Sequence, residues 1–355
     1  MSALGTPWLL VVFAVGAGLT WRAGVELART TDALDARLHL GEEIGGIVLL
    51  AIAGSLPELA ITVSAAAQGN LDLAAGNLIG GIAVQTMVLA ICDVVAGPKR
   101  PLTFLIGALT PVLEGLLVVI LVSGVLLGAL LKPSTSILGV VSPGSIAIVV
   151  GWVTGVYVIN LVRKNPRWSV SMPGSRPGRH RRSEPRPAAV PAAHPFASSS
   201  TGRVAFRFLL ASAVTLGAGV ALELSGNLLA DRAGINGVVF GATVLATATA
   251  LPEISSGVAA VRLGDNALAL GDIFGGNAFQ VCLFLVADLV AGAPVLPTAG
   301  RLNAWLASLG VALTAIYAAG VIGRPERCIA RMGPDSLLAL IVFALGVAGL
   351  LVLPS

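Results

Sequence analysis

Long apolar runs, separated by short polar stretches, make up most of the chain. Several runs reach the roughly 20 apolar residues that an α-helix needs to cross a bilayer, and none alternates in the manner of a membrane β-strand. The fourth run is long for one helix, so we expect a surface stretch before Pro111. The pattern predicts an all-α polytopic membrane protein with ten transmembrane helices, at residues 7–28, 44–67, 71–96, 102–131, 144–162, 204–228, 235–261, 266–291, 302–322 and 335–354.

Composition supports the membrane assignment. Hydrophobic residues make up 56% of the 355 residues and charged residues 11%, whereas soluble domains carry about 25% charged residues. The first run has no basic segment before it and no clear cleavage site, so we treat it as a helix rather than a signal peptide. The three cysteines form no readable disulfide framework.

Basic residues are concentrated in alternate loops. With the N-terminus outside, the outer loops carry only Lys132, Arg232 and Arg301, and the remaining loop lysines and arginines lie inside. The positive-inside rule therefore predicts that both termini are outside. The net charge of +4 follows from the same rule and does not indicate a nucleic-acid partner. The composition suggests a prokaryotic source, so we expect the plasma membrane as the location.

A basic segment divides the chain into two units. Residues 163–203 are rich in Pro, Arg, Ser and Ala and cannot bury enough apolar surface to fold alone. We interpret them as a disordered cytoplasmic loop between a first unit, residues 1–162, and a second unit, residues 204–355. The positive charge would fit contact with anionic lipids, and a plain linker that obeys the positive-inside rule explains the same composition.

The two units are related by an internal repeat. Residues 44–97 and 239–292 align without a gap at an offset of 195 positions, and 21 of the 54 pairs are identical. Each unit has five predicted helices, an odd number, so the second unit enters the membrane upside down relative to the first. Inverted five-helix repeats around a midplane site are typical of transporters that work by alternating access.

Each second helix contains the triplet Leu-Pro-Glu, which ends at Glu58 and at Glu253. Proline removes a backbone donor, so both helices should break there and expose carbonyl oxygens near residues 51–55 and 246–250. An ionised carboxylate at the membrane midplane costs about 2.5–3.5 kcal/mol. One such residue could be a protonated carboxyl bonded to a neighbouring helix, but a matched pair indicates function. Two facing glutamates and nearby carbonyls would suit Ca2+, which prefers about six to eight oxygen ligands.

The third helix of each unit carries three polar or glycine positions, four residues apart and therefore on one face. They are Asn77, Gly81 and Gln85 in the first unit, and Asp272, Gly276 and Gln280 in the second. We expect most of the glycines in these helices to serve close helix packing. We expect the two glutamines to face the glutamates, because intramembrane amides need partners.

These paired motifs resemble the α-repeats of the cation/Ca2+ exchanger superfamily, which includes Na+/Ca2+ and Ca2+/H+ antiporters. The resemblance covers both repeats and agrees with the ten-helix plan. It implies a calcium-binding glutamate in each half, flanking oxygen ligands, and polar ligands on the third helices. The candidate cation ligands are Glu58, Glu253, Gly54 (through its carbonyl), Ser55, Thr249, Gln85, Gln280, Asn77, Asp272 and Asn277.

The chain departs from the family pattern at several hydroxyl positions. The Thr-Ser pair of the family reads Gly-Ser at 54–55 and Thr-Ala at 249–250. The Gly-Ser-Asn pattern reads Gly-Gly-Ile at 80–82 and Gly-Gly-Asn at 275–277, and Asp272 replaces the usual asparagine. Hydroxyls that serve sodium in Na+-coupled members are therefore missing, and the glutamines look more like those of Ca2+/H+ exchangers.

The sequence thus predicts a secondary antiporter that exchanges Ca2+ against H+ or Na+, with the protons slightly favoured. It is not expected to be an enzyme or to hold a cofactor, because no histidine lies in a predicted span and an inverted duplication has no catalytic rationale. The alternatives are Na+/H+ or other monovalent-cation exchange, a channel, and a transport-inactive homologue. The oligomeric state is not predicted.

Other ionisable residues in or near the apolar runs receive separate interpretations. Glu114 fits a relay, a gate or a protonated bond between helices. We expect Asp93 and Asp288, near the ends of the third helices, to be interfacial caps, and Glu26 and Glu223 to lie at the membrane interface.

Overall fold

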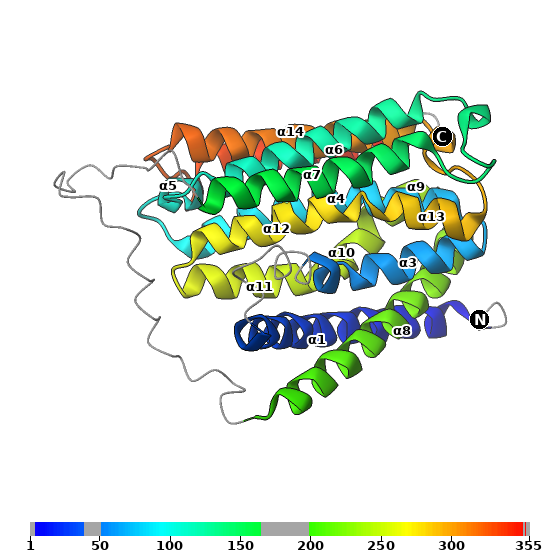
Figure 1. The fold of residues 1–355 in the computed structure, drawn as a ribbon, viewed down its shortest axis with the longest axis horizontal. Helices are drawn as coiled ribbons and strands as arrows, with labels where there is room; N and C mark the ends of the chain where they lie inside the picture. The colour runs from blue at the N-terminus through cyan, green and yellow to red at the C-terminus, as the bar shows by residue number, and fades with distance from the viewer. Residues whose placement is uncertain (1–3, 39–50, 165–198, 351, 353–355) are drawn as a thin grey trace.

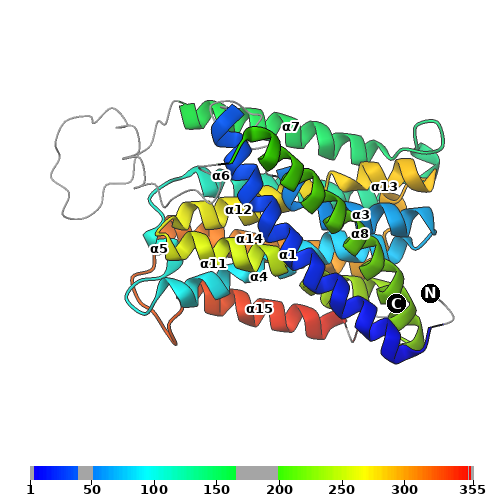
Figure 2. The same ribbon diagram turned by 90° about the horizontal axis from the view of Figure 1, so that it is seen from below.

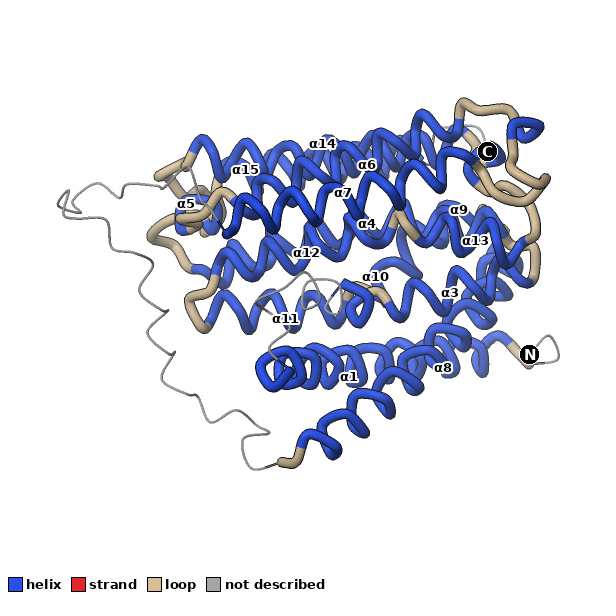
Figure 3. Tube along the Cα trace, viewed as in Figure 1, coloured by secondary structure: helices blue, strands red, loops and turns tan. Residues whose placement is uncertain are grey.

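The computed structural model describes residues 4–38, 51–164, 199–350 and 352. Within these residues the regular structure is helical, as predicted (Figures 1 and 3). Among the described residues, seven helices are long and apolar enough to cross a membrane, a bent pair counts as an eighth if it forms one span, and two further apolar helices are shorter. The predicted central loop lies largely outside the described residues.

The first half contains α1 (Thr6–Leu38), α3 (Leu56–Ala67), α4 (Leu71–Ala96), α5 (Leu102–Leu105), α6 (Thr110–Ala129) and α7 (Pro143–Lys164). The second half contains α8 (Thr201–Ala233), α9 (Gly237–Phe240), a π-helical turn η3 (Gly241–Leu245), α10 (Ala246–Thr249), α11 (Leu251–Arg262), α12 (Asn266–Gln280), α13 (Leu283–Ala291), α14 (Arg301–Gly323) and α15 (Pro334–Leu350). Short α5 and the residues that follow it form the expected stretch before Pro111.

The helices form a bundle in which α4 and α12 occupy the middle (Figure 1). Helices α1 and α8 pack against each other and run obliquely across one side (Figure 2). Both termini lie at one end of the bundle, and the end of α7 and the beginning of α8 lie at the other. This arrangement agrees with an even number of spans.

Both Leu-Pro-Glu segments interrupt a helix, as predicted. Residues 51–54 are helical, Ser55 forms a turn, and α3 begins at Leu56. In the second half, α10 ends at Thr249 and α11 begins at Leu251, and the two parts are bent by 46°. In both cases proline occupies one of the first two helical positions, where its missing N–H group has no helical partner to lose.

Glycines on α4 allow the second half to approach closely. A Cβ atom added at Gly76 would lie 2.6 Å from the Val238 carbonyl oxygen, and one added at Gly80 would overlap Ala242. The expected role of these glycines in close packing is therefore confirmed for this pair. Through these contacts, α9 and η3 pack closely against the first part of α4.

Glu223 on α8 is fully buried within the protein, and its expected place at the membrane interface stays a prediction. Its carboxylate accepts hydrogen bonds of 2.7 Å from the Ser64 hydroxyl and from the Gln68 amide, at the end of α3. The cost of burying this carboxylate is offset by donors from the neighbouring helix. Glu26 behaves differently, since it is partly exposed and lies 3.6 Å from Arg207.

Asp93, at the end of α4, joins the first half to the second. Its buried carboxylate accepts hydrogen bonds from the backbone N–H groups of Leu102 (2.6 Å) and Gly333 (2.7 Å), and from the Ser336 hydroxyl (2.6 Å). Gly333 and Ser336 flank the start of α15. Asp93 therefore supplies the acceptor that the N-terminus of α15 needs.

Asp288 repeats this arrangement at the opposite end of the bundle. Its buried carboxylate accepts hydrogen bonds from the N–H groups of Ser142 (2.9 Å) and Val295 (2.7 Å). Ser142 immediately precedes α7, so each third helix caps the fifth helix of the other half. The prediction that both aspartates are caps is confirmed, but they are buried.

We expect Asp93→Ala and Asp288→Ala to destabilise the protein strongly. Each change leaves two or more buried donors without an acceptor, at a cost of about 3 kcal/mol, which corresponds to a fall in Tm of roughly 5 °C or more. Thermal unfolding in detergent measures the effect. Asp72→Ala is the matched control, because Asp72 lies on the same helix but is exposed. Equal Tm values for Asp93→Ala and this control would contradict the assigned role.

Candidate functional site

The breaks at Ser55 and Ala250 place Glu58 and Glu253 in the first turns of α3 and α11. The N-terminus of a helix carries a partial positive charge, which favours a carboxylate there. Gln85, which donates a hydrogen bond to Glu58, lines the same cavity as Glu253. The inverted halves therefore bring their two glutamates to one place.

The surroundings of Glu58 come from both halves. Glu58 is 1% exposed, and the Gln85 side-chain amide donates a 2.9 Å hydrogen bond to its Oε1 atom. Thr249, from α10 of the second half, lies beside the same carboxylate. The Oε2 atoms of Glu58 and Glu253 are buried and accept no hydrogen bond from the described residues. Two buried carboxylate oxygens without donors are the arrangement that a bound cation would complete.

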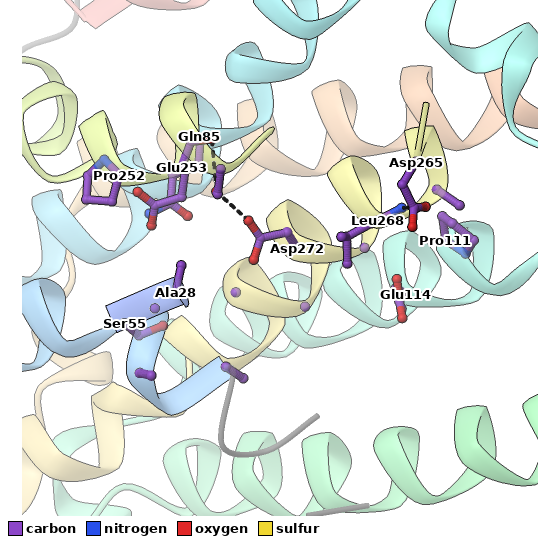
Figure 4. Close-up of a pocket in the computed structure, with 18 of the residues that line it drawn as sticks. Ala28, Ser55, Gln85, Pro111, Glu114, Pro252, Glu253, Asp265, Leu268 and Asp272 are labelled. Carbon is purple, nitrogen blue, oxygen red and sulfur yellow. Dashed lines mark hydrogen bonds between the residues drawn. The ribbon is translucent and has the colours of Figure 1, made fainter. Parts of the chain in front are cut away.

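A cavity of about 410 Å³ leads to this pair. Ser55, Gln85 and Glu253 line one part of it, together with Gly54, which is exposed, and Arg163 and Asp265 line another part. Figure 4 shows Glu253 and Gln85 together at one end and Asp265 at the other, with Asp272 between them. We call the end at Arg163, next to the last residue of α7, the mouth of the cavity, because Arg163 and the lining residue Leu268 are exposed, and we call the end at Gln85 and Glu253 the deep site.

Asp272 lies along the cavity rather than beside Glu58. Its Oδ2 atom accepts a 2.7 Å hydrogen bond from the Ser256 hydroxyl, and both residues line the cavity. Glu114 also lines it, and its Oε2 atom lies where Gly271 leaves room (a Cβ added there would be 3.0 Å away). Acidic side chains thus mark the path from the mouth to the deep site.

Three of the predicted ligands lie elsewhere. Gln280 donates to the Leu78 carbonyl oxygen on α4 (2.8 Å), so the expectation that both glutamines contact the glutamates is met only by Gln85. Asn277 donates to the Thr86 hydroxyl at 3.1 Å. Asn77 is buried within α4, and its side-chain amide makes no hydrogen bond in the described part of the chain. The side chains of Gln280 and Asn277 therefore join α12 to α4, and the side chain of Asn77 is buried where α4 packs against its neighbours.

Sequence reasoning missed Ser256 and Arg163 as residues of the cavity. Ser256 follows Glu253 by three positions and is therefore on the same helical face. That spacing and the hydroxyl within an apolar run were available signals. Arg163 gave no local signal, because its place at the mouth depends on how α7 packs against the rest of the bundle.

Comparison with known proteins identifies the family. The family described as "Sodium/calcium exchanger protein" matches residues 8–163 and 204–353, which cover both halves. The chain belongs to this family. It is therefore a multi-pass membrane transporter of the exchanger type, and the sequence-based resemblance is confirmed.

Two curated relatives are similar along most of the chain. The inner membrane protein YrbG of Escherichia coli (strain K12) is 26% identical over 260 residues, which are 73% of this chain and 70% of the relative. The putative antiporter CaxA of Alkalimonas amylolytica is 25% identical over 301 residues, 83% of this chain and 86% of the relative.

Solved exchanger structures share the fold. The H+/Ca2+ exchanger CAX has a TM-score of 0.68 at 15% identity, over 98% of this chain and 82% of that chain. YfkE has a TM-score of 0.64 at 15% identity, over 98% of each chain. The sodium-calcium exchanger NCX_Mj has a TM-score of 0.59 at 15% identity, over 97% of this chain and 99% of that chain. The predicted architecture of inverted repeats agrees with these matches.

The paired glutamates make a prediction about stability. In buffer without divalent cations, we expect Glu58→Gln and Glu253→Gln to leave Tm unchanged or to raise it. Each change removes one of two neighbouring buried charges, and replacing such charges is often stabilising by about 1 kcal/mol or more. Glu326→Gln, in an exposed loop, is the control. A clear fall in Tm would show that donors within the protein already satisfy the carboxylates.

Proposed function

We propose that the protein is a secondary-active antiporter that exchanges Ca2+ against H+ or Na+ by alternating access. The observation that carries the proposal is the pair Glu58 and Glu253, one from each inverted half, each with a buried oxygen that has no donor among the described residues. Glu253 and Gln85, which donates to Glu58, line a cavity that gives a cation a path to the pair. Family membership supplies the exchanger type.

The ligand chemistry favours a hard divalent cation. The two carboxylates would neutralise the charge of Ca2+ and supply up to four oxygens. The Thr249 hydroxyl and the carbonyl oxygens exposed at the broken turns, including that of Gly54, are the further oxygens within the site. The same set is too poor in nitrogen and sulfur to favour a softer transition metal.

Exclusive occupancy explains how one site couples two ions. A proton or Na+ that neutralises Glu58 or Glu253 removes the oxygen charge that Ca2+ needs, so the ions bind in turn rather than together. Two positions that would hold hydroxyls in sodium-coupled members are Gly54 and Ala250 in this chain. The absence of hydroxyl groups at these two positions supports the proton as the coupling ion. The similarity of fold to an H+/Ca2+ exchanger agrees with this choice.

The direction in which the cavity faces supports a place in the transport cycle. Its mouth lies at the end of the bundle that carries the basic loops, which the positive-inside rule places in the cytoplasm. The contacts of Gly76 and Gly80 with Val238 and Ala242 close the opposite side. We therefore assign the structure to an inward-facing state of a plasma-membrane protein with both termini outside.

The test is uptake of radiolabelled calcium into proteoliposomes that contain the purified protein. We expect uptake to rise when an outward H+ gradient is imposed, and to fall by about two orders of magnitude or more in Glu58→Gln and Glu253→Gln, because each change removes a charge that binds the ion. An outward Na+ gradient measures the other coupling ion. Glu326→Gln is the control and should transport normally.

Other outcomes separate the alternative functions. Exchange of Na+ for H+ without any calcium uptake would indicate a monovalent-cation exchanger. Neither calcium nor sodium flux under any gradient, from protein that is folded in detergent, would indicate a transport-inactive homologue.

A further inference from the structure

The two glutamines of the repeat are equivalent in sequence but have different partners. Gln85 donates to Glu58, the glutamate of its own half. Gln280 stands 195 positions later, yet it donates to the Leu78 carbonyl oxygen of the other half. Glu253, which is the equivalent of Glu58, therefore lacks the bond that Gln85 makes to Glu58, and it lines the cavity, which Glu58 does not. Gln85 thus bonds to a glutamate that is buried, whereas Gln280 makes no bond to Glu253, which lines the cavity.

A glycine makes room for the displaced glutamine. A Cβ atom added at Gly81 would overlap the Nε2 atom of Gln280, so only a glycine lets this amide lie against α4. The repeat-equivalent residue is Gly276 on α12, which lines the cavity and has no atom within 4 Å of an added Cβ. We call the space beside each of these two glycines a notch. The notch at Gly81 is filled by Gln280, and the notch at Gly276 is empty in the described part of the structure.

The faces of α4 and α12 show the same asymmetry over a longer stretch. Leu73 is 1% exposed, whereas its repeat equivalent Leu268 is 50% exposed. Gly76 and Gly80 pack against the second half, whereas Gly275 faces open space. The polar face of α4 is thus closed along its length, and the matching face of α12 lines the cavity.

Resting on the proposed function, we propose that Gln85 and Gln280 exchange partners during transport and that Gly81 and Gly276 are the notches that receive them. In the opposite state, Gln280 leaves Gly81 and donates to Glu253. Gln85 then leaves Glu58, enters the notch at Gly276 and donates to the carbonyl oxygen of Ile273, which is the repeat equivalent of Leu78. Each glutamine covers its own glutamate only when that glutamate is shut off from water.

This exchange gives the two glutamines a positioning role. The covered glutamate keeps a donor while water is excluded, so its charge is never left without a partner. The open glutamate keeps its oxygen free for the incoming ion. Because the two amides move in opposite directions, the two sides of the membrane cannot be open to the site together.

The proposal predicts opposite effects for two glycine variants. Gly276→Ala meets no atom in the present structure, so the protein should fold and remain inward-facing, but the notch for Gln85 is lost. Gly81→Ala displaces the flexible end of Gln280, so it should shift the population toward the opposite state. Each variant should lower calcium exchange by about tenfold or more, since both block one direction of the conformational step.

The state of the protein can be read without any transport. Leu268→Cys is the reporter, in a Cys328→Ser background because the other two cysteines, Cys92 and Cys282, are buried. We would measure its labelling rate with a charged maleimide in detergent. The rate should stay at or above the parental value with Gly276→Ala and fall about threefold or more with Gly81→Ala, as the inward-facing population falls.

Gly217→Ala is the matched control, because Gly217 is an exposed helical glycine of α8 with no atom near an added Cβ. It should change neither exchange nor labelling. Calcium exchange by Gly276→Ala at the rate of this control, or labelling that Gly81→Ala does not lower, would overturn the proposal. If the parental protein exchanges no calcium, the proposed function fails, and the labelling comparison still decides whether the notches set the state.

Discussion

The dominant constraint on this structure is the cost of burying two carboxylates within a membrane protein. Each lies just after a proline that breaks its helix, so the helix N-terminus favours the negative charge. Gln85 supplies one donor, but one oxygen on each glutamate has no partner among the described residues. A cavity in the described part of the structure joins Gln85 and Glu253 to the exposed Arg163. The unsatisfied oxygens are the reason for assigning a cation to the site.

A second pair of buried carboxylates fastens the two halves around this site. Asp93 and Asp288 each accept hydrogen bonds at the start of the fifth helix of the other half. These contacts lie at opposite ends of the bundle, so the halves are interlocked rather than merely adjacent. Charge-assisted hydrogen bonds of this kind are strong and directional.

The inverted repeat is symmetric in sequence, whereas the structure is asymmetric. A single inverted pair of halves open to both sides would be a channel, so an exchanger must place equivalent residues in different environments at any moment. Gln85 and Gln280 show this at the level of single hydrogen bonds, and Leu73 and Leu268 show it in exposure. Under the proposed mechanism, the asymmetry corresponds to one state of the protein rather than to a divergence of the two halves.

The sequence by itself determined the helical membrane fold, the inverted repeat, the two helix breaks and the pairing of Glu58 with Glu253. These follow from hydrophobic length, from the parity of spans and from the chemistry of proline and buried charge, which act locally or repeat along the chain. Only the tertiary structure decided that Gln280 and Asn277 turn to α4, that Asp272 lines the path rather than the deep site, and that Glu223 is buried. Those outcomes depend on which side of the bundle is closed, and a symmetric sequence pattern contains no information about that choice.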